Sequence, residues 1–205
     1  MPTWQFFHED GQSCHSCRLR RPRDPQPVDL TVIELRQYTL HPGRRDELIE
    51  LFERELVEPQ EAVGMTILGT FRDLDDPDRF VWLRGFRDMP TRKKALTAFY
   101  GGPVWAEHGP KANATMVDSS NARLLHPSHW SVPNTPSHCV TAELTTGRVT
   151  DNTALAVLTP LNVENDFPRL PVRTDPITVV LRRDPDPQPA PGLLRLAPTA
   201  RSRIS

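Results

Sequence analysis

The stretch TVIELRQYTL, residues 31–40, carries the pattern that decides the fold. Apolar residues on one face alternate with charged and aromatic residues on the other, which is the two-residue period of a half-buried strand. The apolar residues are Ile33 and Leu35. The charged and aromatic residues are Glu34, Arg36 and Tyr38. We therefore expect the regular structure to begin with a strand here.

A helix is expected directly after this strand. The turn His41-Pro42-Gly43 leads into residues 44–57, where leucines and a phenylalanine recur at three- and four-residue spacing, as in an amphipathic helix. Pro59 should kink or end this helix, because proline lacks a backbone N–H and its ring meets the preceding turn. Gly64 is expected to close the segment.

A hairpin and a second helix follow. Residues 65–72 and 80–86 have the composition of strands, and the acidic turn between them joins them as a hairpin. Asp88 is a good N-cap for a helix that Gly101-Gly102 should stop.

The order of elements indicates the fold class. Pro103 should restart a helix, Gly109-Pro110 should interrupt it, and residues 121–126 should add a strand. Strand, helix, strand, strand, helix, strand is the order of a ferredoxin-like split βαβ module, of α+β class. Both helices would then lie on one face of a four-stranded antiparallel sheet.

The sheet face opposite the helices is expected to be bare. In the register used here that face carries charged and aromatic side chains, and a slip of one residue would reverse the assignment. These side chains are Glu34, Arg36, Tyr38, Trp82 and Arg84. A face rich in aromatic rings normally packs on another sheet, so we expect a second layer of strands to cover it.

Proline content divides the chain. Residues 1–29 are expected to be a disordered extension, 30–127 an ordered module and 128–138 a linker. Residues 139–205 should be mostly strands and Pro-rich loops, without helices. Their strand-like runs are 139–145, 154–160 and 177–183.

Four motifs of the first module resemble the NIPSNAP family over about residues 30–127. They are ELRQYTLHPGRRDELIELFERELVEPQEAVGM, FRDLDDPDRFVWLRGF, AFYGGPVW and NATMVDS. The later segments ALAVLTPLNVENDFPRLPVRTD and LRLAPTARS look like the second barrel half of longer bacterial members. The resemblance implies a dimeric α/β-barrel fold whose second half is shortened here, because the sequence for both of its helices is missing. It also implies a homodimer, or a pseudo-dimer within one chain, that pairs through the sheet face.

Composition excludes some classes of partner. Lysine and arginine number 25 against 26 acidic residues, so no global field attracts nucleic acid or an anionic membrane. The apolar runs are far shorter than the roughly 20 residues that span a bilayer. Three cysteines do not make a disulfide framework and fit a reducing compartment, which predicts a cytoplasmic protein.

Several motifs carry weak signals for a metal or nucleophilic site. The Cys14 and Cys17 pair has no second ligand pair at a zinc-like spacing, and Pro127 separates His126 from His129. The remaining candidates are the acidic turn Asp73, Asp75, Asp76 and Asp78, the serines Ser119 and Ser120, and Cys139. The turn lacks the glycine and glutamate of a calcium loop, and the serines and Cys139 lack a motif-placed base. No phosphate-binding glycine loop is present, so we expect neither a metal nor a cofactor.

The stretch FYGGPVWAEH, residues 99–108, holds the strongest candidates for catalysis. Trp105 and His108 share one helical face, and Tyr100 can approach the same space. These rings either fill the core or line a pocket for an aromatic or polyketide-like substrate, with His108 as general base. Tyr38 is a further candidate in that pocket.

The charged residues of the strands allow two readings. Glu34, Arg36 and Arg84 either form a salt-bridged seam between two sheets, or an arginine anchors an acidic ligand. Candidate ligand-binding residues are Arg36, Trp82, Arg84, Tyr100 and Trp105. The sequence favours a small-molecule-binding or assembly module for an apolar or aromatic ligand. The alternative is a cofactor-independent oxygenase or isomerase.

Overall fold

The computed structural model describes residues 30–132 and 139–204. In chain order the elements are β1 (Val32–Leu40), α1 (Arg45–Leu51), the π-helical segment η2 (Phe52–Leu56), α2 (Val57–Ala62), β2 (Thr66–Asp73), β3 (Arg79–Phe86), α3 (Met89–Tyr100), α4 (Pro103–Asn113), β4 (Met116–Trp130), β5 (Val140–Thr146), β6 (Ala156–Pro160), β7 (Ile177–Arg183) and β8 (Leu193–Pro198). The predicted disorder of residues 1–29, with the Cys14 and Cys17 pair, lies outside the described residues.

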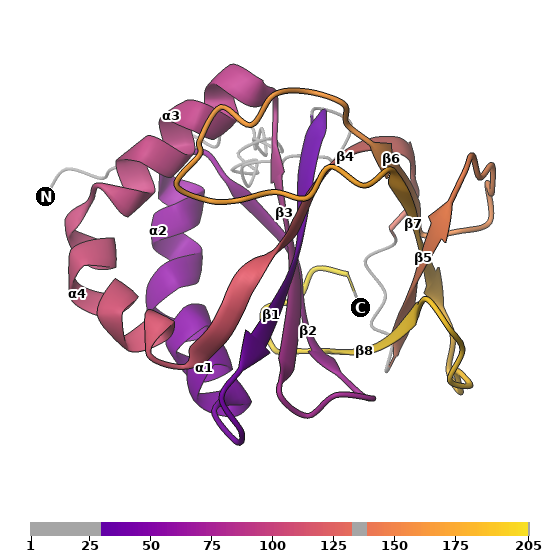
Figure 1. Cartoon of the computed structure of the whole chain (residues 1–205), viewed down its shortest axis with the longest axis horizontal. Helices are drawn as coiled ribbons and strands as arrows, with labels where there is room; N and C mark the ends of the chain where they lie inside the picture. The colour runs from indigo at the N-terminus through magenta and orange to yellow at the C-terminus, as the bar shows by residue number, and fades with distance from the viewer. Residues whose placement is uncertain (1–29, 133–138, 205) are drawn as a thin grey trace, which may run out of the picture.

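The strands close into one antiparallel barrel in the order β1-β3-β2-β8-β5-β7-β6-β4. β4 completes it, because it pairs with β1 along one edge and with β6 along the other. The helices lie together outside one wall, and the strands of the second half form the opposite wall (Figure 1). The chain is therefore a mixed α/β fold built on a β-rich sheet.

Local sequence explains the boundaries of α3. Asp88 caps the helix, since the Thr91 N–H donates to Asp88 Oδ1 at 2.7 Å, and Pro90 occupies the first turn. The helix ends at Tyr100 and a new one begins at Pro103, so Gly101-Gly102 is the break that the sequence predicts.

The predicted interruption of α4 at Gly109-Pro110 is wrong. The helix continues through Pro110 to Asn113, and the Ala114 N–H still donates to Pro110 O at 3.0 Å. A Cβ at Gly109 would lie 2.7 Å from the Trp105 ring. The glycine thus permits close packing within the helix rather than ending it.

Pro59 does not end the first helical region either. The helix widens before it, where the Val57 N–H donates to Phe52 O across five residues, and this wider turn is η2. Pro59 then falls in the first turn of α2, where a missing N–H is tolerated. Gly64, with φ of 99°, turns the chain into β2 as expected.

The two faces of β1 and β3 are the reverse of the predicted assignment. Tyr38 and Trp82 pack beneath the helices, whereas Leu35 and Leu83 point into the barrel. The helices offer aromatic partners such as Phe52, whose ring centroid lies 4.8 Å from that of Trp82. The second-half strands offer aliphatic residues that match Leu35 and Leu83: Val140, Leu158, Val179, Leu181 and Leu196. Aromatic and charged residues therefore go to the helix layer and aliphatic residues to the interior.

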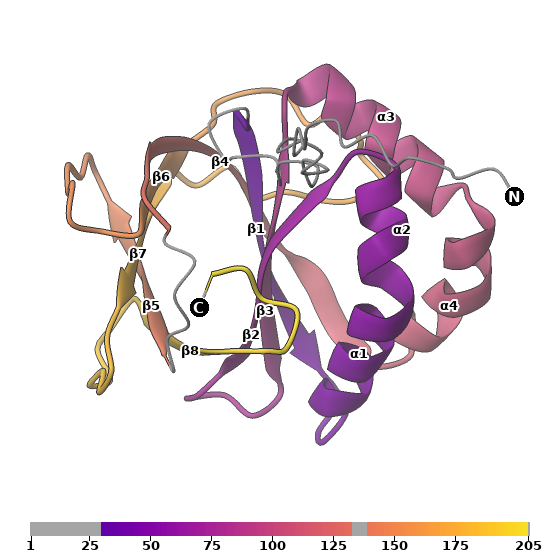
Figure 2. The same cartoon turned by 180° about the vertical axis from the view of Figure 1, so that it is seen from behind.

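The second half supplies the far wall of the barrel. β7 has the predicted bounds, and no helix occurs in the described part of the chain after residue 139. β4 extends to Trp130, into the predicted linker, because its last residues pair with β6 around a bulge between Pro127 and His129. The segment after β8 folds back into the barrel, where Ile204 is fully buried (Figure 2).

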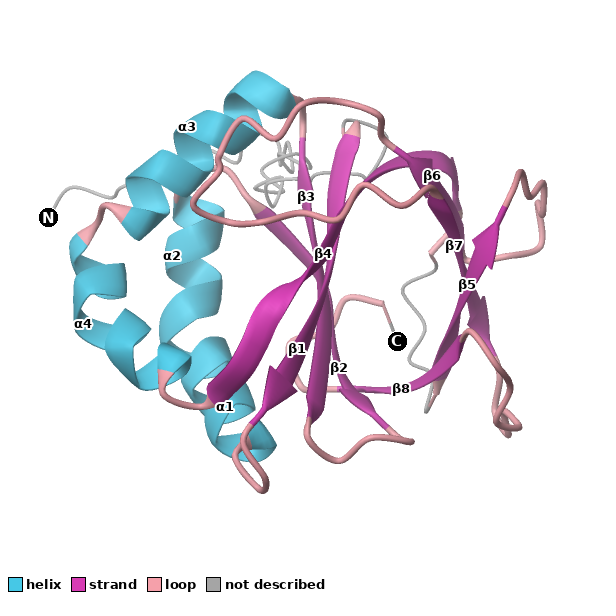
Figure 3. Cartoon of the chain, viewed as in Figure 1, coloured by secondary structure: helices cyan, strands magenta, loops and turns pink. Residues whose placement is uncertain are grey.

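Residues 161–176, between β6 and β7, form a long loop that we call the crossing loop. It leaves the barrel wall, passes in front of β1 and β4, and reaches α3 (Figure 3). Leu161, Phe167, Leu170 and Val172 pack on the core beneath the helices. The crossing loop thus brings the second half of the chain to the helix layer.

Candidate functional site

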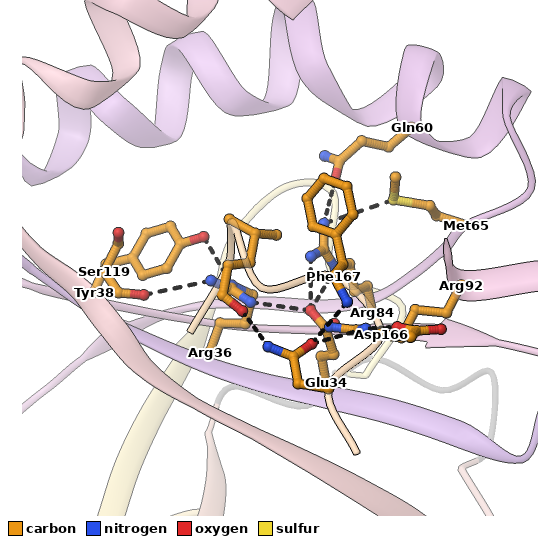
Figure 4. Close-up of polar contacts among 12 residues, drawn as sticks. Glu34, Arg36, Tyr38, Gln60, Met65, Arg84, Arg92, Ser119, Asp166 and Phe167 are labelled. Carbon is orange, nitrogen blue, oxygen red and sulfur yellow. Dashed lines mark hydrogen bonds and ion pairs between the residues drawn. The ribbon is translucent and has the colours of Figure 1, made fainter. Parts of the chain in front are cut away.

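Glu34 lies at the centre of a buried charged cluster between the sheet and the helices (Figure 4). Arg84, directly opposite on β3, donates from Nε to Glu34 Oε2 at 2.8 Å. Arg36 donates from Nη1 to the same oxygen at 3.1 Å. Arg92, from the beginning of α3, donates from Nε to Glu34 Oε1 at 2.6 Å. We call Glu34 with these three arginines the Glu34 cluster.

The arginines keep the glutamate ionised. Burial alone would raise the pKa of Glu34, but the positive charges of Arg84, Arg36 and Arg92 outweigh it and hold the pKa well below its ordinary value. Burial raises the pKa of Tyr38, so the phenol is neutral near pH 7, and its oxygen accepts from Arg36 Nε at 2.9 Å.

The crossing loop adds a second carboxylate to the cluster. Asp166 forms an ion pair with Arg92 Nη1, which also donates to Asn165 Oδ1 at 3.2 Å. The Asp166 side chain is 22% exposed, whereas Arg92 is fully buried. This ion pair therefore lies where the cluster meets the surface.

The cluster holds more positive than negative charge. Its arginines face the carboxylates of Glu34 and Asp166, which leaves one uncompensated positive charge among the described residues. Two side-chain nitrogens here, Arg92 Nη2 and Trp82 Nε1, are buried and have no hydrogen-bond acceptor among the described residues. The Trp82 ring centroid lies 5.1 Å from Arg84 Cζ and 6.0 Å from Arg36 Cζ. An anion could satisfy both the charge and the donors.

A cavity of about 20 Å³ adjoins the cluster. It is lined by aromatic and aliphatic residues of the helices and sheet, together with Gln60: Tyr38, Leu48, Phe52, Leu56, Gln60, Trp82, Phe99, Tyr100, Trp105, Ala112 and Met116. A cavity of this size holds about one water molecule. Anything larger would have to displace neighbouring groups.

The structure brings together most of the predicted site residues. Tyr38, Tyr100 and Trp105 line the cavity with Trp82, and Arg36 and Arg84 belong to the adjoining cluster. His108 is not a lining residue: its Nε2 lies 3.7 Å from Glu55 Oε2, against η2. The geometry therefore separates His108 from the other candidates.

Among the minor candidates, Asp73, His126 and His129 have polar partners and Cys139 is buried. Asp73 accepts from Arg79 at 2.9 Å, and His126 Nδ1 lies 3.1 Å from Thr31 O. His129 Nε2 lies 3.1 Å from Ala154 O, and burial raises the pKa of the Cys139 thiol. In residues 30–132 and 139–204, no three His, Cys, Asp or Glu side chains are grouped so that they could hold a metal ion.

Two larger hollows lie away from the cluster. One of about 390 Å³ is lined by β4, β6 and the loop before β6. The other, of about 280 Å³, borders both ends of the crossing loop and includes Arg123 and Asp175, which pair at 2.7 Å. Arg123 Nε, at the hollow of about 280 Å³, is also buried without an acceptor in the described part of the chain, but Arg123 is paired with Asp175. We regard the Glu34 cluster as the better candidate, because its surplus positive charge lies on fully buried arginines, although the adjoining cavity is smaller.

Arg92, Asp166 and Phe167 were missed by the sequence reasoning. Arg92 shares the helical stripe of Ala95, Leu96 and Phe99, so its spacing placed it on the buried face of α3. The crossing loop has no periodicity, so no comparable signal was available for Asp166 and Phe167.

Comparison with known proteins supports the family resemblance. Residues 33–132 match the NIPSNAP family model. A NIPSNAP family protein of unknown function from Agrobacterium tumefaciens is 19% identical, with 50% of this chain and 93% of that chain covered and a TM-score of 0.46. A NIPSNAP-like domain protein from Burkholderia xenovorans is 27% identical, with 51% and 91% covered and a TM-score of 0.46. No curated protein matches at a significant level.

One solved structure is similar over both halves. It is a proposed monooxygenase from Lactobacillus acidophilus, 12% identical, with 82% of this chain and 94% of that chain covered and a TM-score of 0.52. At this identity the likeness concerns the fold alone. Among the described residues, no helix has the length and apolar character to cross a membrane. From the match to the family model, the chain contains a NIPSNAP domain at residues 33–132.

Proposed function

We propose that this protein binds a small, partly apolar molecule between the sheet and its helices. The observation that carries the proposal is a pair of buried donors without acceptors among the described residues: Arg92 Nη2 in the Glu34 cluster, which has surplus positive charge, and Trp82 Nε1 beside it. A buried donor without an acceptor costs about 1–3 kcal/mol. Water could accept these hydrogen bonds but would not neutralise the charge, whereas an acidic group would do both.

The residues in and around the cluster would contact different parts of the ligand. Arg36 and Arg84 contribute positive charge, and Trp82 contributes an N–H at the border between the cluster and the cavity. Tyr100 and Trp105, whose ring centroids lie 4.7 Å apart, offer aromatic surface for the apolar part of a ligand.

The test uses two tryptophans that share one property. Trp82 and Trp130 both have a buried Nε1 without an acceptor, but Trp130 packs with the barrel core, away from the Glu34 cluster. Native mass spectrometry of protein purified from its own host should show a retained small molecule. Trp82→Phe should reduce its occupancy, while Trp130→Phe should leave it unchanged. Equal occupancy in both variants, or no retained molecule in the wild type, would count against the proposal.

The finer architecture is part of the proposal. The order β4-β1-β3-β2, with both helical connections on one face, supports a ferredoxin-like half-barrel closed by a partial second half. Self-association of copies, a cytoplasmic location and an oxygenase or isomerase activity stay predictions from the sequence. Such an activity would depend on Tyr38 or Tyr100, because His108 does not line the cavity.

A further inference from the structure

The crossing loop places a carboxylate and an aromatic ring, from consecutive residues, at the proposed site. The Asp166 carboxylate is paired with Arg92 of the Glu34 cluster. The Phe167 ring stacks on Tyr100 of the cavity, with centroids 5.9 Å apart and an interplanar angle of 30°. Both partners belong to α3, so the loop occupies the side of the site that α3 forms.

We propose that Asp166 and Phe167 are an internal occupant that mimics the ligand, and that the ligand is an aromatic carboxylic acid. This inference rests on the proposed function and specifies its ligand class. A free arylcarboxylate would place its carboxylate on Arg92 and its ring on Tyr100, in exchange for the two loop side chains. The exchange replaces one carboxylate on Arg92 with another, so a monoanion preserves the charge balance of the cluster.

The attachment of the crossing loop permits this exchange. Near its ends the loop is held by backbone hydrogen bonds, from Leu161 N to Leu124 O at 3.0 Å and from Arg173 N to Ala122 O at 2.7 Å. Its middle is attached to α3 through side chains: Asn165, Asp166, Phe167 and Arg169. A ligand can replace these side-chain contacts without breaking the backbone hydrogen bonds between the strands of the barrel.

Space beside the loop also permits movement. The hollow of about 280 Å³ is lined by both ends of the crossing loop, residues 161–163 and 172–176. The cavity on the helix side, about 20 Å³ with the loop in place, does not hold an aromatic acid. Displacement of Phe167 would free the face of the Tyr100 ring on which it stacks, and Tyr100 lines this cavity.

The internal occupant should therefore compete with the ligand. In a two-state exchange, the apparent affinity is reduced by the fraction of molecules whose loop occupies the site. Weakening the loop contacts should raise the affinity for an arylcarboxylate, even though the variant removes a polar group from the site. A merely structural role for Asp166 predicts the opposite or no change.

The experiment is calorimetric titration of the full chain with phenylacetate, phenylacetamide and acetate. Phenylacetate should bind to the wild type, and Asp166→Asn should tighten its binding by about tenfold through loss of the internal competitor. Glu164→Gln is the matched control, since Glu164 is an exposed carboxylate of the same loop. It should leave the affinity unchanged. Phenylacetamide lacks the charge and acetate lacks the ring, so both should bind more weakly than phenylacetate.

Hydrogen–deuterium exchange supplies a second readout. Phenylacetate should increase exchange in residues 162–172, because it releases the loop, whereas a ligand that fits under a closed loop would decrease exchange there. Phe167→Ala should bind phenylacetate more tightly than wild type for the same reason as Asp166→Asn. Unchanged or weaker binding in both loop variants would overturn the inference.

Failure of this inference can be distinguished from failure of the proposed function. If the protein retains a small molecule from its host but phenylacetate binds to none of the variants, the inference is wrong and the binding function stands. Equal affinity for phenylacetate and phenylacetamide would also overturn the carboxylate assignment. If no molecule is retained and no probe binds to any variant, both are wrong.

Discussion

The two faces of β1 have different surroundings, although the residues that form them alternate along one strand. Glu34 and Leu35 are neighbours, and both are almost completely buried. Glu34 contacts three arginines beneath the helices, whereas Leu35 packs among aliphatic side chains inside the barrel. One buried layer is thus built to hold charge and the other to exclude it. Charge on β1 is thus confined to the helix layer, where the proposed binding site lies.

Adding a carboxylate to the interior face of β1 should produce the largest effect. Leu35→Asp would place a charge in the aliphatic interior, and we expect a loss of more than about 5 kcal/mol in the free energy of unfolding, so that the barrel does not form. Leu35→Met should cost less than about 1.5 kcal/mol, because volume and polarity are kept. Circular dichroism and urea unfolding measure both. A folded, stable Leu35→Asp protein would show that the interior tolerates charge.

Removing the central carboxylate should have the next largest effect. Glu34→Gln leaves buried arginines without their counter-ion, and breaking a buried ion pair in this way costs about 3–5 kcal/mol. Glu143→Gln is the control: Glu143 pairs with Arg182 at 2.7 Å, but both side chains are partly exposed and Arg182 also pairs with Asp151, so its loss should cost about 0–1 kcal/mol. Equal losses in urea unfolding would contradict the distinction between buried and surface pairs.

Acid should weaken the helix layer. The pKa of Glu34 is lower in the folded chain than its usual 4.5, so the cluster contributes stability above that pH and loses it as the pH falls below. The free energy of unfolding of the wild type should therefore rise with pH more steeply than that of Glu34→Gln between about pH 3 and 5. Asp151 and Asp175, with pKa values lowered to about 2, also contribute in acid, but they are present in both proteins and cancel in the comparison. Parallel pH profiles would contradict this role of Glu34.

His108→Ala should have the smallest effect. Its imidazole lies beside Glu55 and away from the cavity, so we expect a change in stability within about 0.5 kcal/mol and unchanged occupancy by a retained molecule. Thermal unfolding and native mass spectrometry measure these quantities. A lost ligand in this variant would return His108 to the site.

The order of elements could be predicted from the sequence, because the hydrophobic periodicity and the residues that begin or end helices agree along residues 31–126. The alternation around Ile33, the Asp88 cap and the Gly101-Gly102 break all have the predicted structural roles. The choice of face could not be predicted. A two-residue period shows that Glu34 and Leu35 point in opposite directions, but not which of them meets the helices.

Part of the candidate site could be identified from the sequence, and its role stays a proposal. Arg36, Trp82, Arg84 and the aromatic residues were found because they stand out on strands and in a helix break. Pro110 led to a wrong prediction for α4. Its own carbonyl still accepts the Ala114 N–H, so the helix continues past it. The contribution of Asp166 depends on a loop whose path is set by tertiary contacts, which no local pattern encodes.

The continuous path of β4 through both walls has a consequence for how the barrel assembles. β4 is held to β1 on one side and to β6 on the other without leaving the sheet. The covering strands are therefore tethered to the surface they cover, and their effective concentration there is set by the chain itself rather than by the amount of protein in solution. Interior burial in a single molecule is then as complete at high dilution as in concentrated solution.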